Sequence, residues 1–174
     1  MSFAQRLDAM IRRVDDFPKP GIRFLDLTPV FADAPMLREL VDELAKPWRT
    51  RRPTHVVGIE ARGFILGAGV ALTLGAGFVP ARKGGKLPSQ KVGQAYALEY
   101  GEGLLELHQD ALPKGARVLV VDDLLATGGT AAAVVSLIER LGVAVEGISF
   151  AIELSALGGR KKLSGHAWTS LLNL

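Results

Sequence analysis

Apolar residues in this chain of 174 residues follow two patterns, short dense runs and longer segments at helical spacing. The dense runs are rich in valine, isoleucine and leucine, which is typical of strands buried on both faces of a sheet. They lie at 55–60 (HVVGIE), 76–82 (AGFVPAR), 117–123 (RVLVVDD) and 143–154 (VAVEGISFAIEL). Helices are expected between them, at 61–75 and 127–142. This alternation predicts an α/β fold, with βαβ units and a mostly parallel twisted sheet flanked by helices.

The N-terminal third has a different pattern. Residues 3–14 carry apolar side chains at helical spacing and predict a helix. Pro35 can begin a second helix, which runs to about Trp48, because proline is favoured in a first helical turn. Between the two helices, several prolines and Gly21 forbid a continuous helix and predict an ordered loop with short extended pieces.

Two further segments interrupt the strand–helix alternation. The stretch KGGKLPSQKVGQ (83–94) is polar and glycine-rich, which predicts a mobile loop. Gly101-Glu102-Gly103 separates two strand-like runs, 95–100 and 104–109, and predicts a hairpin. The stretch that follows Leu154 is less regular.

The composition narrows the class of protein. Hydrophobic residues make up 48% and charged residues 22%, which indicates a folded globular chain, and the length fits one domain over 1–174. With no cysteine, disulfides and thiolate metal sites are excluded. The N-terminus lacks a signal-peptide core, and no apolar stretch is long enough to span a membrane, so we expect a cytoplasmic protein.

The charge balance allows an anionic partner. The net charge is +3 and the pI about 9.4, which suits either a nucleic acid or an anionic small molecule. Basic residues gather locally at 49–52, 82–86 and 160–162, and each group alone is equally consistent with solvated surface. The three histidines do not have metal-ligand spacing, so no metal site made of protein ligands is predicted.

The strongest chemical signal lies at the end of the run 118–121, where Asp122 and Asp123 follow buried apolar residues. Buried adjacent carboxylates are costly, and a ligand with hydroxyl groups or a cation offsets that cost. The small residues that follow allow their backbone N–H groups, at the start of a helix, to approach an anion. A sugar phosphate fits both halves, whereas a simple helix cap leaves the two acids unexplained. The loop residues are Ala126, Thr127, Gly128, Gly129 and Thr130.

Neither common nucleotide fingerprint is present, since the chain lacks both the P-loop pattern and G-x-G-x-x-G after its first strand. Instead, VLVVDDLLATGGTA (118–131) closely resembles the phosphoribosyl diphosphate signature of the type I phosphoribosyltransferases. Five further segments resemble the adenine-specific branch of that family, in the same order along the chain. They are FPKPGI-F-D-TP (17–29), GIEARGF (58–64), RKGGKLP (82–88), ALEYG (97–101) and ELSALGGRKKL (153–163).

The resemblance implies a fold, a reaction and partners. The fold is that of a type I phosphoribosyltransferase, with a small N-terminal hood at about 15–35 and a mobile hairpin loop at about 83–102. The reaction joins adenine to phosphoribosyl diphosphate and gives AMP and diphosphate, a step of purine salvage. Mg²⁺ is expected to be held mainly through diphosphate, ribose and water, since this cation uses few carboxylates. A homodimer is also implied, with no nucleic-acid or membrane partner.

The segment GIEARGF lies at a predicted strand-to-helix turn. Gly63 permits close approach of the backbone, and Arg62 brings a positive charge toward an anion. The resemblance implies that this turn, with Glu60 and Ala61, binds the diphosphate and that Arg62 acts on a phosphate in catalysis. An ordinary surface charge at a helix start is the alternative for Arg62.

The basic loop carries Arg82, Lys83 and Lys86 around glycines. Cations there stabilise the charge that builds on a departing diphosphate, and the glycines allow the loop to close. An exposed basic loop is the alternative. The resemblance implies diphosphate contacts, with Lys86 among the catalytic residues, and it leaves open which base acts from a neighbouring subunit.

Base recognition rests mainly on the resemblance. It implies that Glu99 manages a proton of the purine ring, as a general acid or base, and that Tyr100 belongs to the lid; a solvated hairpin charge is the alternative. It also implies a hood in which Phe24 stacks on the purine while Arg23 and Leu25 offer backbone groups. Many members have a basic residue where this chain has Leu25, and Phe24 is equally consistent with a core aromatic.

Two other functions stay open. One is transfer to another purine such as xanthine, because the base pocket has no fingerprint as specific as the sugar-phosphate loop. The other is a non-catalytic regulator that senses phosphoribosyl diphosphate and binds nucleic acid. No added helix-turn-helix segment is evident for the second, and the bases gather at the predicted phosphate loops.

Overall fold

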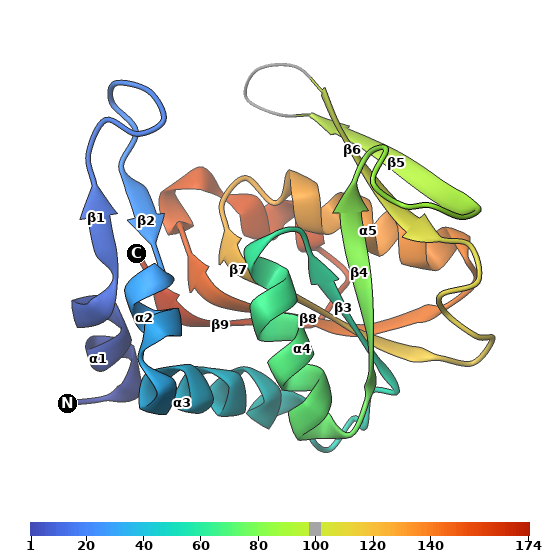
Figure 1. The fold of residues 1–174 in the computed structure, drawn as a ribbon, viewed down its shortest axis with the longest axis horizontal. Coiled ribbons are helices and arrows are strands. Elements are labelled where there is room, and N and C mark those ends of the chain that lie inside the picture. The colour runs from blue at the N-terminus through green and yellow to red at the C-terminus, as the bar shows by residue number, and fades with distance from the viewer. Residues whose placement is uncertain (98–101) are drawn as a thin grey trace.

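The computed structural model describes residues 1–97 and 102–174. Within these residues a seven-stranded sheet has the order β5-β6-β4-β3-β7-β8-β9 (Figure 1). Five strands run parallel: β3 (His55–Ile59), β4 (Gly77–Lys83), β7 (Arg117–Leu125), β8 (Ala144–Glu153) and β9 (Trp168–Asn173). The hairpin strands β5 (Lys91–Ala97) and β6 (Glu102–His108) are antiparallel to each other and extend the sheet beside β4. The mostly parallel sheet predicted from the sequence is therefore confirmed.

Helices cover both faces of this sheet. Successive residues of β7 face opposite sides: Val118 and Val120 join one apolar cluster with the buried residues of α5 (Gly129–Arg140). Leu119 and Val121 join a second cluster with α4 (Arg62–Leu74) and α3 (Ala34–Ala45). Burial on both faces explains why the core strands are continuous apolar runs rather than alternating ones.

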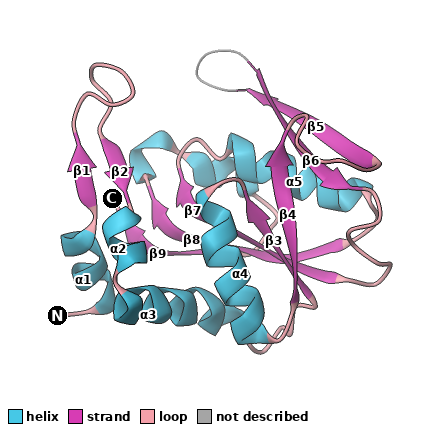
Figure 2. Ribbon diagram, viewed as in Figure 1, coloured by secondary structure: helices cyan, strands magenta, loops and turns pink. Residues whose placement is uncertain are grey.

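The N-terminal residues form a separate small layer (Figure 2). Helix α1 (Phe3–Met10) begins with a capping box between Ser2 and Gln5. It ends earlier than the apolar spacing predicts, because Arg12–Val14 form strand β1, which pairs antiparallel with β2 (Phe24–Asp26). This two-stranded ribbon and the short helix α2 (Thr28–Ala32) make up the hood segment. Helix α3 begins near Pro35 and continues into a 3-10 turn, η1 (Lys46–Trp48), as predicted.

The C-terminal stretch is more regular than its sequence suggests. After β8 come two 3-10 turns, η2 (Ser155–Leu157) and η3 (Gly159–Leu163), and then the edge strand β9. The sequence analysis missed β9 because it gains its partner only from β8, and its residues are only half-buried. Within the described residues, no helix combines the length and the apolar character needed to cross a lipid bilayer.

Candidate active site

The parallel register brings three loops to one edge of the sheet. Ile59 of β3 lies opposite Ala81 of β4, and Gly58 lies opposite Val121 of β7. Because these neighbouring strands run in the same direction, the loops after them leave at the same edge, where ligands of open α/β sheets bind. Residues near 60–63, 81–86 and 122–130 therefore lie together at this edge.

The loop after β7 encloses a small pocket. Gly128 has a φ of +77°, a left-handed conformation that favours glycine, and helix α5 begins at the next residue. The first N–H groups of a helix lack partners within it and attract anions. The pocket has a volume of about 60 Å³, which suits one phosphate group better than a whole nucleotide. Its lining residues are Asp122, Leu124, Leu125, Ala126, Thr127, Gly128, Thr130 and Ala131.

The two acids lie beside this pocket with different surroundings. Asp122 accepts a hydrogen bond from the backbone N–H of Asp123 at 2.9 Å, and a Cβ added to Gly63 would lie 2.9 Å from Asp122 Oδ1. Burial, together with the neighbouring Asp123 charge, raises the pKa of Asp122 well above its ordinary value. Burial also raises the pKa of Asp123, although Arg62 acts in the opposite direction. Gly63 is needed beside Asp122, because a side chain at position 63 would collide with that carboxylate.

Arg62 joins these acids to the hood. Its Nε lies 2.8 Å from Asp123 Oδ2, an electrostatic contact that is not aligned as a hydrogen bond. Its Nη1 donates to the carbonyl of Leu25 at 2.9 Å, and its guanidinium lies 5.1 Å from the ring centroid of Phe24. The sequence analysis expected Arg62 on a phosphate and missed these partners, which come from a distant segment and leave no local signal. The phosphate contact of Arg62 stays a prediction.

A buried carboxylate holds the basic loop. Glu60 pairs with Lys86 at 2.8 Å and with Arg82 at 3.4 Å, and it accepts the backbone N–H of Lys83 at 2.9 Å. Burial alone would raise the pKa of Glu60, but the bonds from Lys86 and Lys83 and the charges of Lys86 and Arg82 lower it to about 2. The turns after β3 and β4 are thus one electrostatic unit, and Ala61 lies exposed beside it.

Glu106 of β6 supports the same loop from the other side, and the sequence analysis did not single it out. Its carboxylate accepts the backbone N–H of Gly85 at 2.9 Å and lies 3.1 Å from Lys91 Nζ. The residue is 5% exposed. An acid inside the apolar run LLELH is the signal that points to it, because a buried charge needs partners.

The hood residues have distinct environments. The Leu25 side chain is 6% exposed and lies in the core, so a ligand would meet its backbone, and its carbonyl already accepts from Arg62. Phe24 is half-buried and packs edge-on against Phe17 at 5.2 Å. Arg23 pairs with Asp15 at 2.6 Å on the surface. Glu99 and Tyr100 lie outside the described residues, and their roles stay predictions.

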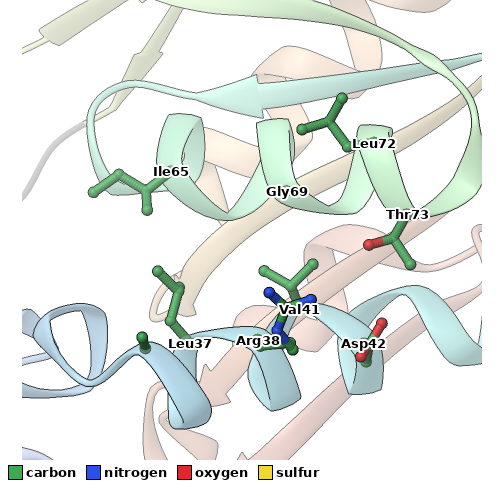
Figure 3. Close-up of a pocket in the computed structure, with 9 residues that line it drawn as sticks. Leu37, Arg38, Val41, Asp42, Ile65, Gly69, Leu72 and Thr73 are labelled. Atoms are coloured by element: carbon green, nitrogen blue, oxygen red, sulfur yellow. The ribbon is translucent and has the colours of Figure 1, made fainter.

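A larger hollow lies between α3 and α4 (Figure 3). It measures about 440 Å³, and Gly69 allows close helix packing there, since an added Cβ would lie 2.7 Å from a methyl group of Val41. Ile65 and Leu72 on its rim are 46% and 84% exposed. None of the predicted substrate residues lines this groove.

Together, the parallel sheet, the acid pair with its small-residue loop and the basic loop define a type I phosphoribosyltransferase. A family model described as "Phosphoribosyl transferase domain" matches residues 32–173. Among curated relatives, the adenine phosphoribosyltransferase of Desulfitobacterium hafniense is 53% identical over 165 residues, which are 95% of each chain. That of Salinispora arenicola is 50% identical over 98% of this chain and 91% of its own.

Solved structures of adenine phosphoribosyltransferases have the same fold as this chain. The adenine phosphoribosyltransferase of Rhodothermus marinus superposes with a TM-score of 0.94 at 48% identity, over 99% of this chain and 98% of its own. The Saccharomyces cerevisiae enzyme superposes with a TM-score of 0.92 at 39% identity, over 98% of each chain. The chain belongs to the adenine phosphoribosyltransferase family.

Proposed function

We propose that the protein transfers 5-phosphoribose from phosphoribosyl diphosphate to adenine, giving AMP and diphosphate. The observation that carries this proposal is the convergence of a phosphate-sized pocket, the adjacent acids Asp122 and Asp123 and a basic loop at one sheet edge. The yeast relative, 39% identical, was crystallised with adenine and an imino-altritol bisphosphate. Phosphoribosyl diphosphate, a sugar with a charged group at each end, matches the arrangement of the pocket, the acids and the basic loop.

The phosphoribose half would bind along the loop after β7. Backbone N–H groups at 126–130 would hold the 5′-phosphate, helped by the hydroxyls of Thr127 and Thr130. The acids would accept hydrogen bonds from the ribose hydroxyls. Asp122 lines the pocket of this loop, so its carboxylate is placed to accept from the hydroxyl of a sugar bound there.

The leaving-group half would bind at the turns 60–63 and 82–86. As the bond from the anomeric carbon to the diphosphate oxygen breaks, negative charge grows on the diphosphate. Fixed cations nearby stabilise that charge without reorganising. Lys86 is suited to this role because Glu60 holds its ammonium group in place, and Arg62 would supply a second charge. A bond to the purine nitrogen then forms at the anomeric carbon, which has oxocarbenium-like character.

Recognition of adenine would come from the hood and the hairpin. Phe24 would stack on the ring, with backbone groups of Arg23 and Leu25 at its edge. Glu99 would accept or return the ring proton while the purine nitrogen attacks, and Tyr100 would help cover the site. We infer a single domain over 1–174, with the hood at about 15–35 and the mobile hairpin loop at about 83–102, which includes strand β5.

The metal that the family implies is Mg²⁺, and the donor set fits it. Among the described residues, no group of three or more histidine, aspartate or glutamate side chains could hold a metal. Mg²⁺ usually keeps several waters and combines one or two carboxylates with substrate phosphates. Asp122 and Asp123 would steady it through the ribose hydroxyls, while diphosphate oxygens supply most ligands. When bound, the ion neutralises charge on the leaving diphosphate.

The test is a product assay with a panel of bases. Purified protein is incubated with phosphoribosyl diphosphate, Mg²⁺ and adenine, guanine, hypoxanthine or xanthine, and nucleotides are resolved by chromatography. AMP formation that requires Mg²⁺ is expected. Turnover of another base but not of adenine would indicate a phosphoribosyltransferase for that base. Tight, salt-dependent binding of nucleic acid without turnover would indicate a regulator.

We also propose a homodimer that buries the groove between α3 and α4 against a second copy. The exposed apolar residues Ile65 and Leu72 lie on the α4 side of the groove, and the oppositely charged Arg38 and Asp42 lie on its α3 side (Figure 3). In a two-fold interface the same surface of each copy faces the other, so the apolar rims of the two grooves would cover each other. Light scattering should give twice the chain mass for the native protein and the chain mass for Leu72→Glu. A native monomer would refute the dimer.

A further inference from the structure

The segment 153–163, ELSALGGRKKL, has no part in the reaction proposed above, although it resembles the family as clearly as the site loops do. It joins β8 to the turn before β9 and contains η2 and η3. Its first residues run beside the end of β7, where Glu153 pairs in register with Leu125. The backbone N–H of Leu154 donates to the Leu125 carbonyl at 2.9 Å. The segment therefore leaves the sheet next to the phosphate loop.

Two glycines then bring the backbones into direct contact. A Cβ added to Gly128 would lie 2.4 Å from the carbonyl oxygen of Gly159. A Cβ added to Gly159 would lie 2.2 Å from the carbonyl oxygen of Ala126 and 2.9 Å from the nitrogen of Gly128. Ordinary contacts begin at 3.4 Å, and here the obstacles are backbone atoms that cannot rotate away. The outer wall of the phosphate loop is thus the backbone of Gly159.

An ion pair between a buried carboxylate and a half-exposed arginine fixes this wall. Both carboxylate oxygens of Glu153 accept from the guanidinium of Arg160, at 2.7 and 2.8 Å, in the two-pronged geometry that arginine favours. The Glu153 side chain is 0% exposed. The Arg160 guanidinium also lies 5.4 Å from the ring centroid of Trp168 on β9. Arg160 adjoins Gly159, so this pair sets where the Gly159 backbone lies.

The far end of the segment is anchored in the core. Leu163 is 1% exposed and packs in the same apolar cluster as the buried residues of α5, the helix that begins at the phosphate loop. The segment is therefore held at both ends and in the middle, with its inner surface against residues 126–128.

From these contacts we infer that Gly159 and Arg160 are positioning residues for the 5′-phosphate: segment 153–163 is a brace that fixes the shape of the phosphate loop. The inference rests on the proposed function, because it takes the ligand of that loop to be the phosphate of a phosphoribosyl group. Backbone donors bind an anion well only when their geometry is fixed, and a displacement of about 1 Å in an active site can lower the reaction rate by about 100-fold.

The main test is Gly159→Ala, with binding of ribose 5-phosphate and of diphosphate measured separately by calorimetry. The brace contacts the phosphate loop and not the turns proposed for diphosphate. The expected result is therefore at least about a tenfold weaker binding of ribose 5-phosphate, about the loss of one hydrogen bond to a charged group. Binding of diphosphate should stay as in the native protein. A loss of fold alone would weaken both ligands equally.

Arg160→Lys is the second variant. It keeps the positive charge beside Glu153 but removes the planar fork, so it should fold and show a smaller loss confined to ribose 5-phosphate. Gly165→Ala is the matched control: Gly165 has a φ of +94° and open space around it, so alanine strains the chain just beyond the brace without touching the phosphate loop. It should lower the melting temperature and leave both affinities unchanged.

The possible outcomes distinguish a failure of the brace hypothesis from a failure of the proposed function. Native-like binding of ribose 5-phosphate in Gly159→Ala and Arg160→Lys would refute the brace and leave the proposed function intact. Equal weakening of both ligands in the two variants would also refute it. A native protein that makes no AMP and binds neither ligand would overturn the proposed function, and the brace with it.

Discussion

Replacing Arg62 with methionine should destabilise the protein in a pH-dependent way. Methionine keeps an apolar, unbranched side chain of similar length and removes the charge, the bond to the Leu25 carbonyl and the contact with Phe24. Asp123 then loses the cation 2.8 Å from its Oδ2 while remaining buried next to Asp122. The largest expected effect is therefore the cost of two adjacent carboxylates with no nearby arginine.

The magnitude follows from the burial of the pair. Breaking a buried ion pair by removing one partner costs about 3–5 kcal/mol. The Asp123 side chain is 7% exposed but that of Arg62 is 28% exposed, so solvent screens part of the interaction. We expect a loss of about 2–4 kcal/mol in the free energy of unfolding at neutral pH. For a chain of this size each kcal/mol shifts the melting temperature by about 2–4 °C, so the shift should be roughly 4–16 °C.

The pH dependence has a definite sign. Burial raises the pKa of Asp123 in the folded protein, and loss of Arg62 raises it further, because Arg62 lowers it in the native protein. A carboxyl group whose pKa is raised by folding destabilises the folded state fully above its folded pKa and not at all below its unfolded pKa. The deficit of Arg62→Met should therefore be largest at neutral and alkaline pH and shrink as the pH falls toward about 4.

The assay is urea unfolding of both proteins across that pH range, without ligands. Arg49→Gln is the control, since Arg49 lies 3.7 Å from Asp42 with both side chains more than half exposed, and such pairs contribute about 0–1 kcal/mol. A deficit for Arg62→Met that does not change with pH would refute the reasoning, because it would come from packing against Phe24 and Leu25 and not from the acid.

Three further outcomes are expected. Asp122→Asn should weaken use of phosphoribosyl diphosphate, seen as a higher KM for it than for the native protein, while the KM for adenine changes less; an unchanged KM would remove Asp122 from sugar binding. The ionised Glu60 carboxylate stabilises the native protein fully above the usual glutamate pKa, and this contribution is lost as the pH falls toward about 2. Glu60→Gln lacks the contribution, so the acid unfolding curves of variant and native protein should converge near that pH; curves that stay apart there would contradict this. Glu99→Gln should lower kcat by about 100-fold or more with little change in KM, as loss of a general acid or base does; an unchanged kcat would exclude that role.

Features with a local cause could be predicted from the sequence. The buried strands are visible because burial on both faces requires continuous apolar residues, and the phosphate loop is visible because two acids and a run of small residues follow such a strand. Strand β9 could not be predicted, because it depends on pairing with β8. The short helix α2 was missed although its signal is local: Asp26 accepts from the N–H and hydroxyl of Thr28, two residues further on.

The partners of charged side chains could not be predicted either, and these partners link the separate loops of the site to one another. From the sequence, Arg62 and Lys86 are both expected to be cations that pair only with a bound anion. In the structure each already has a carboxylate, Asp123 for Arg62 and Glu60 for Lys86. A diphosphate must therefore compete with, or share, these carboxylates. The same pairs also keep the cations in place before substrate arrives, which reduces the reorganisation that charge stabilisation would otherwise require.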